Sequence, residues 1–314
     1  MEAAELVDRV VAGERRALAR LLTYVEDGTP ARLRAAVAGL HGRSGRAALV
    51  GVTGSPGVGK STLSNALVTE WRRRGRTVAV LAIDPTSPFS GGALLGDRVR
   101  MQDHVLDEGV YVRSMASRGH LGGLSWAAPQ ALTVLDAAGF DVVLVETVGV
   151  GQAEVEIASL ADTTVVALAP GMGDAIQAAK AGILEIADVY CVNKADREGA
   201  DRTVRELRDM QALGHGEWLA PILKTVAATG DGVAELADAI DRHRDWLSTS
   251  GVLDDRRLAR ARRQVADIAL ETIRRRVAGL GEGAALDDLA RQVAARQLDP
   301  YAAADVLLAT IDTA

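Results

Sequence analysis

The chain is poor in aromatic residues, which make up 3% of its 314 residues, and it contains one cysteine. A single cysteine excludes an intrachain disulfide and favours a reducing compartment. Cys191 lies in the apolar stretch Ala-Asp-Val-Tyr-Cys-Val, so we interpret it as a buried strand residue. A catalytic thiol would need a basic and exposed setting. With so few aromatics, the hydrophobic core must consist largely of Ala, Val, Leu and Ile.

The chain also lacks an excess of positive charge and long apolar runs. Its formal net charge of −6 argues against a general nucleic-acid-binding protein, whose surface is usually basic. No apolar run reaches the length that spans a membrane, and the acidic first residues do not have the apolar core of a signal peptide. We therefore expect a cytoplasmic protein that binds neither nucleic acid nor membrane.

Short apolar runs alternate with helical stretches through the middle of the chain. The runs lie at 48–53, 78–83, 110–112, 142–145, 165–168, 189–192 and 222–226. This alternation is typical of crossover units, and uninterrupted apolar runs are typical of strands buried on both faces. We predict an α/β domain over residues 46–250, with a mainly parallel sheet flanked by helices.

Helical patterns extend on both sides of this domain. Apolar residues at helical spacing predict one helix over 2–24 and a second over 31–40, which together form an N-terminal extension, residues 1–45. Strand signals stop near Gly251, and the next three segments with helical patterns predict a C-terminal helical region, residues 251–314. These segments are 253–277, 284–297 and 300–313.

Residues 54–61 read Gly-Ser-Pro-Gly-Val-Gly-Lys-Ser and fit the P-loop pattern at every required position. They stand between a predicted strand and a predicted helix, which favours a phosphate site over a coincidental glycine-rich turn. Glycines let backbone amides approach phosphate oxygens, and the helix start adds the positive end of its dipole. We expect Lys60 to span the β and γ oxygens, Ser61 to ligate Mg²⁺ and Thr62 to lie near the α-phosphate. The full set of predicted phosphate-binding residues is Gly54, Ser55, Pro56, Gly57, Val58, Gly59, Lys60, Ser61 and Thr62.

A second motif, Glu146-Thr-Val-Gly149, closes the predicted strand that begins at Asp141. An acid at this place, with glycine three residues later, fits the metal-side motif of P-loop proteins. There the carboxylate orients the Mg²⁺ shell and the glycine amide senses the γ-phosphate. Gln152 lies just beyond and is a candidate for orienting the attacking water. A glutamine that merely begins a helix is the alternative.

The stretch Asn193-Lys194-Ala195-Asp196 follows another predicted strand and points to guanine. The Asp196 carboxylate can accept hydrogen bonds from N1 and the 2-amino group of guanine, whereas adenine offers neither donor. A buried acceptor left unsatisfied discriminates by about 10⁴-fold. Lys194 can lie across the base, and Asn193 can tie its loop to the P-loop. We also expect the Ala227 amide to meet the guanine oxygen, and we therefore predict GTP rather than ATP.

Four further stretches are informative as a set, namely 83–101, 113–124, 146–154 and 170–182. Together they closely resemble the methylmalonyl-CoA mutase-associated GTPases, the G-protein chaperones of adenosylcobalamin-dependent acyl-CoA mutases. The resemblance extends from about residue 2 to the C-terminus and is densest over 48–200. It implies that Asp84 and Asp97 lie near the metal, although a turn acid and a solvated helix acid are the plain alternatives. It further implies switch segments at 147–160 and 170–181, and a homodimer formed by the terminal helices.

The resemblance implies a Mg²⁺-dependent enzyme that hydrolyses GTP to GDP and phosphate, with Lys60, Asp97, Glu146 and Gln152 as its catalytic residues. It also implies a chaperone that gates cofactor loading and protects or reactivates an acyl-CoA mutase, by default methylmalonyl-CoA mutase. Two other classes remain open. A metallocentre-maturation GTPase would normally carry Cys or His clusters for nickel or zinc. A small-molecule kinase would need an acceptor pocket and a base, for which we find no distinct motif.

Overall fold

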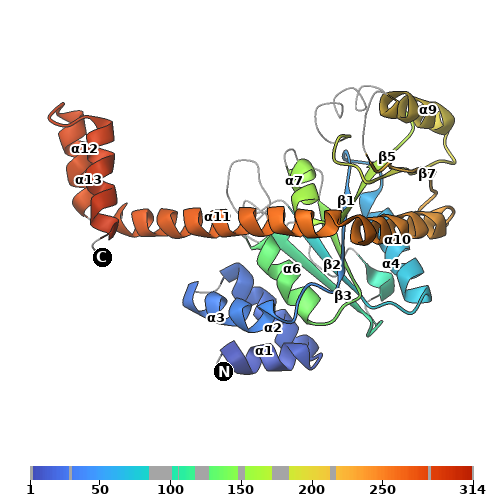
Figure 1. The fold of residues 1–314 in the computed structure, drawn as a ribbon, viewed down its shortest axis with the longest axis horizontal. Helices are drawn as coiled ribbons and strands as arrows, with labels where there is room; N and C mark the ends of the chain where they lie inside the picture. The colour runs from blue at the N-terminus through green and yellow to red at the C-terminus, as the bar shows by residue number, and fades with distance from the viewer. Residues whose placement is uncertain are drawn as a thin grey trace. The chain divides into compact units, whose positions relative to one another are not determined.

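A computed structural model describes residues 3–27, 30–84, 101–104, 106–116, 127–147, 153–171, 184–212, 217–281 and 284–312. The chain forms two compact units, residues 1–256 and residues 257–314. The first unit contains the sheet and the N-terminal helices, and the second contains most of the C-terminal helices (Figure 1).

Within the described residues, seven strands form one sheet in the order β3-β2-β4-β1-β5-β6-β7, and every neighbouring pair is parallel. This confirms the predicted α/β architecture, because each predicted apolar run forms a strand. The last strand is shorter than expected, since Val226 leaves it to form an antiparallel bridge with Asp231. The strands are β1 (Ala48–Thr53), β2 (Val78–Asp84), β3 (Val110–Ala116), β4 (Val142–Thr147), β5 (Thr163–Leu168), β6 (Val189–Val192) and β7 (Ile222–Lys224).

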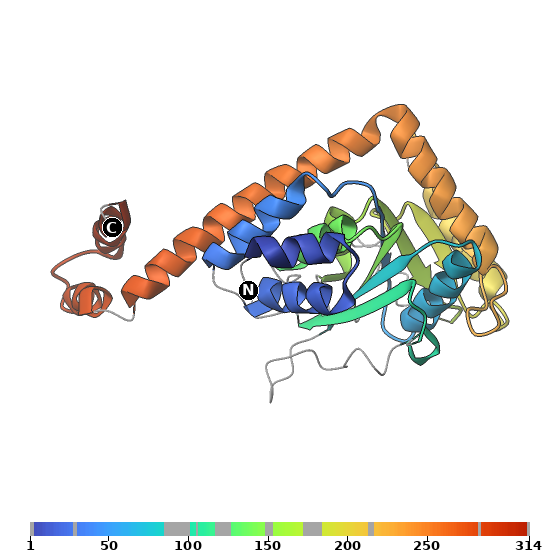
Figure 2. The same cartoon turned by 90° about the horizontal axis from the view of Figure 1, so that it is seen from below.

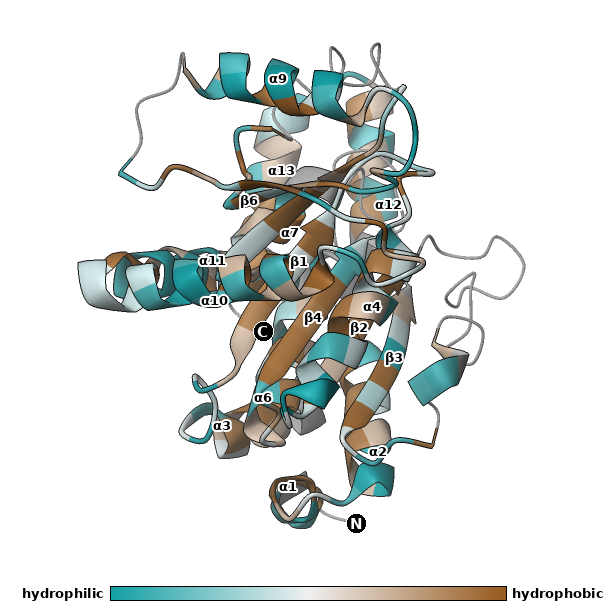
Figure 3. Ribbon diagram, turned by 90° about the vertical axis from the view of Figure 1, so that its right-hand side faces the viewer, coloured by the Kyte–Doolittle hydropathy of each residue, from teal (hydrophilic) through white to brown (hydrophobic). Residues whose placement is uncertain are grey.

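Helices cover both faces of the sheet because the strands carry apolar side chains on both faces, as the brown colour along β4 shows (Figure 3). One face packs against α4 (Lys60–Arg73) and α10 (Val233–Ser250). The opposite face packs against α6 (Ala128–Ala137) and α7 (Ala153–Leu160). Helix α9 (Ala200–Gln211) buries Val204 and Leu207 against β5 and β6.

The N-terminal extension differs from the prediction in one respect. Residues 2–24 do not form a single helix: α1 (Ala3–Val11) and α2 (Arg15–Asp27) are separated by a turn at Gly13, whose φ is +83°. The apolar spacing continues across this turn because both helices contribute to the same core, together with α3 (Pro30–His41) and α6. Figure 2 shows the three N-terminal helices lying together beside the sheet.

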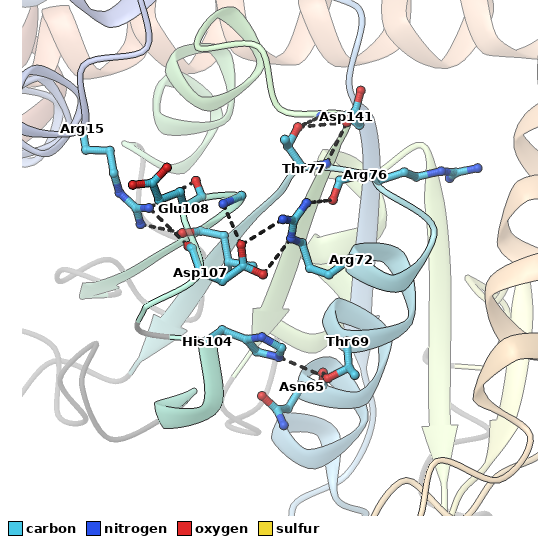
Figure 4. A network of polar contacts seen from close by, with 12 residues as sticks. Arg15, Asn65, Thr69, Arg72, Arg76, Thr77, His104, Asp107, Glu108 and Asp141 are labelled. Atoms are coloured by element: carbon cyan, nitrogen blue, oxygen red, sulfur yellow. Dashed lines mark hydrogen bonds and ion pairs between the residues drawn. The ribbon is translucent and has the colours of Figure 1, made fainter.

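A polar network connects α4 to the chain segment that enters β3 (Figure 4). Asn65 contacts Asp103 and Thr69 contacts His104, and both partners lie in the short helix η1 (Gln102–His104). One turn further along α4, the Arg72 guanidinium donates two hydrogen bonds to the Asp107 carboxylate, at 2.8 and 2.9 Å. These contacts therefore attach α4 to the segment that leads into edge strand β3.

The C-terminal region is helical, as expected. It consists of α11 (Val252–Gly281), α12 (Ala284–Ala294) and α13 (Pro300–Asp312). Helix α10 ends at Ser250, and its C-cap is Gly251, whose φ of +80° lies in the left-handed region that favours glycine. Helices α12 and α13 bury Leu289, Ala303 and Leu307 in a small core of their own. In the described part of the chain, we find no helix with the length and apolar character needed to cross a membrane.

Candidate functional site

The predicted site residues that the structure describes gather at the carboxyl edge of the sheet. Strand β1 lies between β4 and β5, so the chain builds one half of the sheet with β2, β3 and β4 and the other half with β5, β6 and β7. Such a switch in strand order opens a crevice at the carboxyl ends of the strands, where open α/β sheets bind ligands. The P-loop follows β1, Glu146 is the second-last residue of β4, and Asn193 follows β6.

Backbone geometry explains the glycines of the P-loop. Gly54 has φ +139°, and a Cβ added there would lie 2.1 Å from the Ala167 carbonyl oxygen of β5. Gly57 and Gly59 have φ values of +82° and +92°, in the left-handed region that favours glycine. Gly59 is also the N-cap of α4. The loop therefore turns tightly against β5 and leads directly into the positive end of a helix.

Side chains of the P-loop divide between anchoring and accessible positions. Val58 is 1% exposed and anchors the loop in the core beneath α4. Ser55, Pro56, Ser61 and Thr62 are at least partly exposed. A ligand at the helix start can therefore reach the backbone and hydroxyls of this loop.

Lys60 is the first residue of α4 and is 8% exposed. Its ammonium donates hydrogen bonds to the carbonyl oxygens of Gly54 and, at 3.2 Å, Ser55. The ammonium thus lies inside the curve of the loop that the sequence assigns to the phosphates. This position fits the proposed contact with phosphate oxygens.

Ser61 and Glu146 meet although they are 85 residues apart in the sequence. The Ser61 hydroxyl donates to Glu146 Oε1 at 3.0 Å, and Glu146 is 1% exposed. Asp84 is the last residue of β2, the strand beside β4, so its backbone lies at the same edge. Hydroxyl and carboxylate oxygens are the hard ligands that Mg²⁺ prefers, and this donor set therefore fits the metal.

The predicted base-binding motif is bonded directly to the P-loop. Asn193 is 2% exposed, and its Nδ2 donates to the Val58 carbonyl at 2.9 Å. Lys194 has φ +56°, and its ammonium donates to the Gly57 carbonyl at 2.6 Å. Asp196 is exposed. The structure therefore places the expected base and phosphate contacts side by side.

The loop after β7 contributes a residue to which the sequence analysis assigned no role. The Thr225 hydroxyl and the Ala227 amide both donate to Asn193 Oδ1, each at 3.1 Å. The amide expected to meet guanine is thus bonded to Asn193 in this structure. The signal for Thr225 was its place at the end of the strand next to β6, since carboxyl ends of neighbouring parallel strands lie together.

Other predicted site residues lie outside the described residues. These are Asp97, Gly149 and Gln152, together with most of the segment 170–181. The Asp84 side chain is likewise outside the description, although its backbone is within it.

The family model described as methylmalonyl Co-A mutase-associated GTPase MeaB matches residues 18–282. The chain belongs to this family. A relative from Pyrococcus abyssi that is named as a GTPase is 47% identical over 312 residues, which is 98% of this chain and 96% of that protein. GTPase ArgK of Escherichia coli is 37% identical over 262 residues, 80% of this chain and 78% of that protein. The chain is accordingly a P-loop GTPase, as the sequence predicted.

Two further comparisons extend this result. The methylmalonic aciduria type A homolog of Caenorhabditis elegans, a mitochondrial protein, is 33% identical over 81% of this chain and 68% of that protein. The crystal structure described as LAO/AO transport system kinase has a TM-score of 0.70 and 27% identity, and the match covers 99% of this chain and 97% of that one. This confirms the predicted P-loop fold with its helical extensions.

Proposed function

We propose that this GTPase binds GTP with Mg²⁺ at the edge formed by β1, β4 and β6, hydrolyses it to GDP and phosphate, and acts as chaperone of an adenosylcobalamin-dependent acyl-CoA mutase. The observation that supports this site best is the pair of hydrogen bonds from Asn193 and Lys194 to carbonyls of the P-loop. They join the part that recognises a base to the part that holds phosphates, which is what a nucleotide requires.

In this proposal each part of the site has one task. The amides of residues 54–59 and the Lys60 ammonium hold the phosphates, and Thr62 lies near the α-phosphate. Asp196 accepts from N1 and the 2-amino group of guanine, and its exposure leaves it accessible to a ligand. Gly149 senses the γ-phosphate and Gln152 orients the attacking water.

Ser61 and Glu146 would hold Mg²⁺, with Asp84 and Asp97 near it or its waters. The buried position of Glu146 against the Ser61 hydroxyl supports this choice. When bound, the ion neutralises charge that develops on the phosphate oxygens. The chain's own contribution is to keep these oxygen donors beside the first turn of α4.

The partner and the switch are proposed from the family. The matching family is described by its association with methylmalonyl-CoA mutase, so that mutase is the partner we expect. The name of the C. elegans relative points to the same metabolism. We propose that segments 147–160 and 170–181 relay the nucleotide state to the mutase, where the protein gates cofactor loading and protects or reactivates the enzyme in the cytoplasm.

We further propose a homodimer through the C-terminal helices. In α11, Leu258, Val265 and Ile268 are 51%, 69% and 40% exposed. Spacings of seven and three residues place them on one face of the helix. Exposed aliphatic residues in such a row are typical of a helix that packs against another chain, and we take that chain to be a second copy.

The experiment that tests the site compares Lys60→Ala with Lys224→Ala, which removes a surface lysine paired with Asp201. We expect Lys60→Ala to lose GTP binding by at least about 100-fold in calorimetry and to stop phosphate release, because a charge-assisted contact with phosphate is lost. Lys224→Ala should match the wild type. Unchanged hydrolysis by Lys60→Ala would refute this site, and tighter binding of ATP than GTP would refute the base assignment.

The mutase role needs a separate test. Pull-downs from the native cell with a GTP analogue and with GDP should recover an acyl-CoA mutase, and the mutase should raise the rate of phosphate release. Recovery of a hydrogenase or urease with stoichiometric nickel or zinc would favour metallocentre maturation. A phosphorylated metabolite in place of free phosphate would favour a kinase.

A further inference from the structure

Helix α4, whose first turn carries Ser61, bonds along one face to a single segment of the chain (Figure 4). This anchoring face consists of Asn65, Thr69 and Arg72, whose spacing of four and three residues places them on one side of the helix. Their partners all lie in the residues that precede β3, namely 101–104 and 106–109, which we call the anchor segment. The helix that begins at the P-loop therefore also holds the anchor segment.

The contact between Thr69 and His104 has a fixed direction. The Thr69 hydroxyl has one hydrogen, which it donates to the Asn65 carbonyl at 3.0 Å. His104 Nε2 lies 3.2 Å from the same hydroxyl, so this nitrogen must carry a hydrogen and donate it to Thr69. His104 is 8% exposed, and water therefore has little access to replace its partner. Thr69 thus holds His104 through a bond that requires the hydroxyl oxygen.

The contact with Arg72 closes around a glycine. The Asp107 carboxylate accepts two hydrogen bonds from the Arg72 guanidinium and a third, at 2.8 Å, from the Gly109 amide. A Cβ added to Gly109 would lie 2.2 Å from Arg72 Cζ, so the guanidinium fills the space beside this glycine. Arg15 of α2 donates to the carbonyls of Asp107 and Glu108, at 3.3 and 3.2 Å. The anchor segment is therefore held by α4 and by α2.

The anchor segment begins close to the part of the site assigned to the metal. Met101 is 3% exposed and packs in the core that α4 shares with the sheet. The Asn65 amide donates to the Asp103 carboxylate at 3.2 Å. Asn65 lies four residues after Ser61, which is about 6 Å along the helix axis. The segment therefore starts about one helical turn from the Ser61 hydroxyl.

Chain length makes this fixed point decisive for Asp97. Asp97 lies outside the described residues, and the nearest described residues on either side are Asp84 and Met101. It is thirteen residues from Asp84, which permits a span of up to about 45 Å, but four residues from Met101, which permits at most about 14 Å. The position of Met101, and of the anchor segment that it begins, therefore restricts where the Asp97 carboxylate can lie.

We propose that the anchoring face positions a ligand of Mg²⁺: by holding the anchor segment along α4, it keeps Asp97 within reach of the ion at Ser61. This inference rests on the proposed function, since it assumes that Mg²⁺ binds at Ser61 and that Asp97 contributes to its shell. A ligand that is held in place beforehand loses less conformational freedom when the ion binds. Release of the anchor segment should therefore reduce the contribution of Mg²⁺ to nucleotide binding and leave the other nucleotide contacts unchanged.

The test measures binding and does not depend on turnover. A non-hydrolysable GTP analogue is titrated into the full chain by calorimetry, once with EDTA and once with excess Mg²⁺. The dissociation constant in EDTA divided by that in Mg²⁺ gives the contribution of the ion. We expect Arg72→Gln to lower this ratio about fivefold and to leave the affinity in EDTA within about twofold of the wild type.

The matched control is Arg76→Gln. It removes a similarly exposed pair with Asp241, bonded at 2.7 and 3.0 Å, whose carboxylate lies on α10 and not in the anchor segment. Arg76→Gln should lower the melting temperature about as much as Arg72→Gln and retain the wild-type ratio. A role of Arg72 in stability alone would make the two variants alike in both measurements.

Thr69 supplies a second pair of variants, which decides the question if Arg72→Gln does not fold. Thr69→Val removes the acceptor for His104 and should lower the ratio about threefold, whereas Thr69→Ser keeps the hydroxyl and should match the wild type. A wild-type ratio in both Arg72→Gln and Thr69→Val would overturn the inference, as would an equal loss in Arg76→Gln. A wild-type protein whose affinity for the analogue does not depend on Mg²⁺ would instead overturn the proposed function, so the two failures are distinguishable.

Discussion

His243 on α10 should make the folded protein sensitive to mild acid. The side chain is fully buried, and its ring packs beside Trp218 and Trp246, with centroid distances of 4.8 and 5.7 Å. Nδ1 lies 2.9 Å from the Thr163 hydroxyl. Nε2 lies 3.3 Å from Asp188 Oδ1 but without hydrogen-bond geometry. Protonation of this ring would therefore place a charge in a site that does not solvate it.

The charged groups around the ring do not compensate for burial. Asp188 already accepts two hydrogen bonds from the Arg256 guanidinium, at 2.8 and 3.0 Å. The pKa of His243 is lowered to about 4, and burial is the largest cause. Arg256 also lowers the pKa, whereas Asp188 and Asp162 raise it. An unfolded chain would return His243 to about 6.5.

The sign and size of the effect follow from this difference. Between these two pKa values the unfolded chain binds more protons than the folded one, so stability falls as the pH falls through the window. With a folded pKa of about 4, the loss in free energy of unfolding is about 2 kcal/mol from pH 7 to pH 5 and about 3 kcal/mol from pH 7 to pH 4. Above pH 7 the contribution of His243 no longer changes.

Urea unfolding at constant ionic strength measures this loss, followed by the fluorescence of the tryptophans beside the ring. His243→Gln does not titrate, so its stability should fall by about 2 kcal/mol less than that of the wild type between pH 7 and pH 5. Thr163→Val keeps the ring and should retain the wild-type pH dependence at a lower overall stability. Parallel pH profiles for the wild type and His243→Gln would refute the reasoning.

Three further outcomes test other parts of the first unit. Gly51→Ala should cost about 1–3 kcal/mol in thermal unfolding, because the new Cβ would lie 2.9 Å from Ile157 Cγ1; an unchanged melting temperature would show that α7 shifts freely. Arg72→Gln should cost about 1 kcal/mol at pH 7, since the pair with Asp107 is partly exposed. The Arg72 guanidinium lowers the pKa of Asp107, so this difference should shrink as Asp107 is protonated in acid. Cys191 should react with a thiol reagent only after unfolding, because burial keeps it protonated; rapid labelling of the native chain would contradict its assigned place.

Local patterns predicted most of the fold. The run 48–53 matches β1 residue for residue, and the glycine-rich loop and its helix follow as expected. Such elements are predictable because apolar runs and left-handed glycines carry information about their own backbone. The break at Gly13 was missed, since the apolar spacing of α1 and α2 remains continuous when both helices face one core.

The sequence also indicated the members of the site, but their contacts depend on the order of the strands. Ser61 and Glu146 are 85 residues apart, and Asn193 and Val58 are 135 residues apart. They meet because β4, β1, β5 and β6 are neighbours in one parallel sheet, whose carboxyl ends share an edge. No short pattern in the chain encodes that order.

By itself, the sequence determined the class of fold, the family and the residue types at the nucleotide site, because each of these depends on local spacing and composition. Only the tertiary structure decided that Thr225 holds Asn193 and that His243 is buried beside Asp188. The partners of a side chain and its access to water depend on segments that are distant in the chain. Those properties arise when the strands and helices pack together.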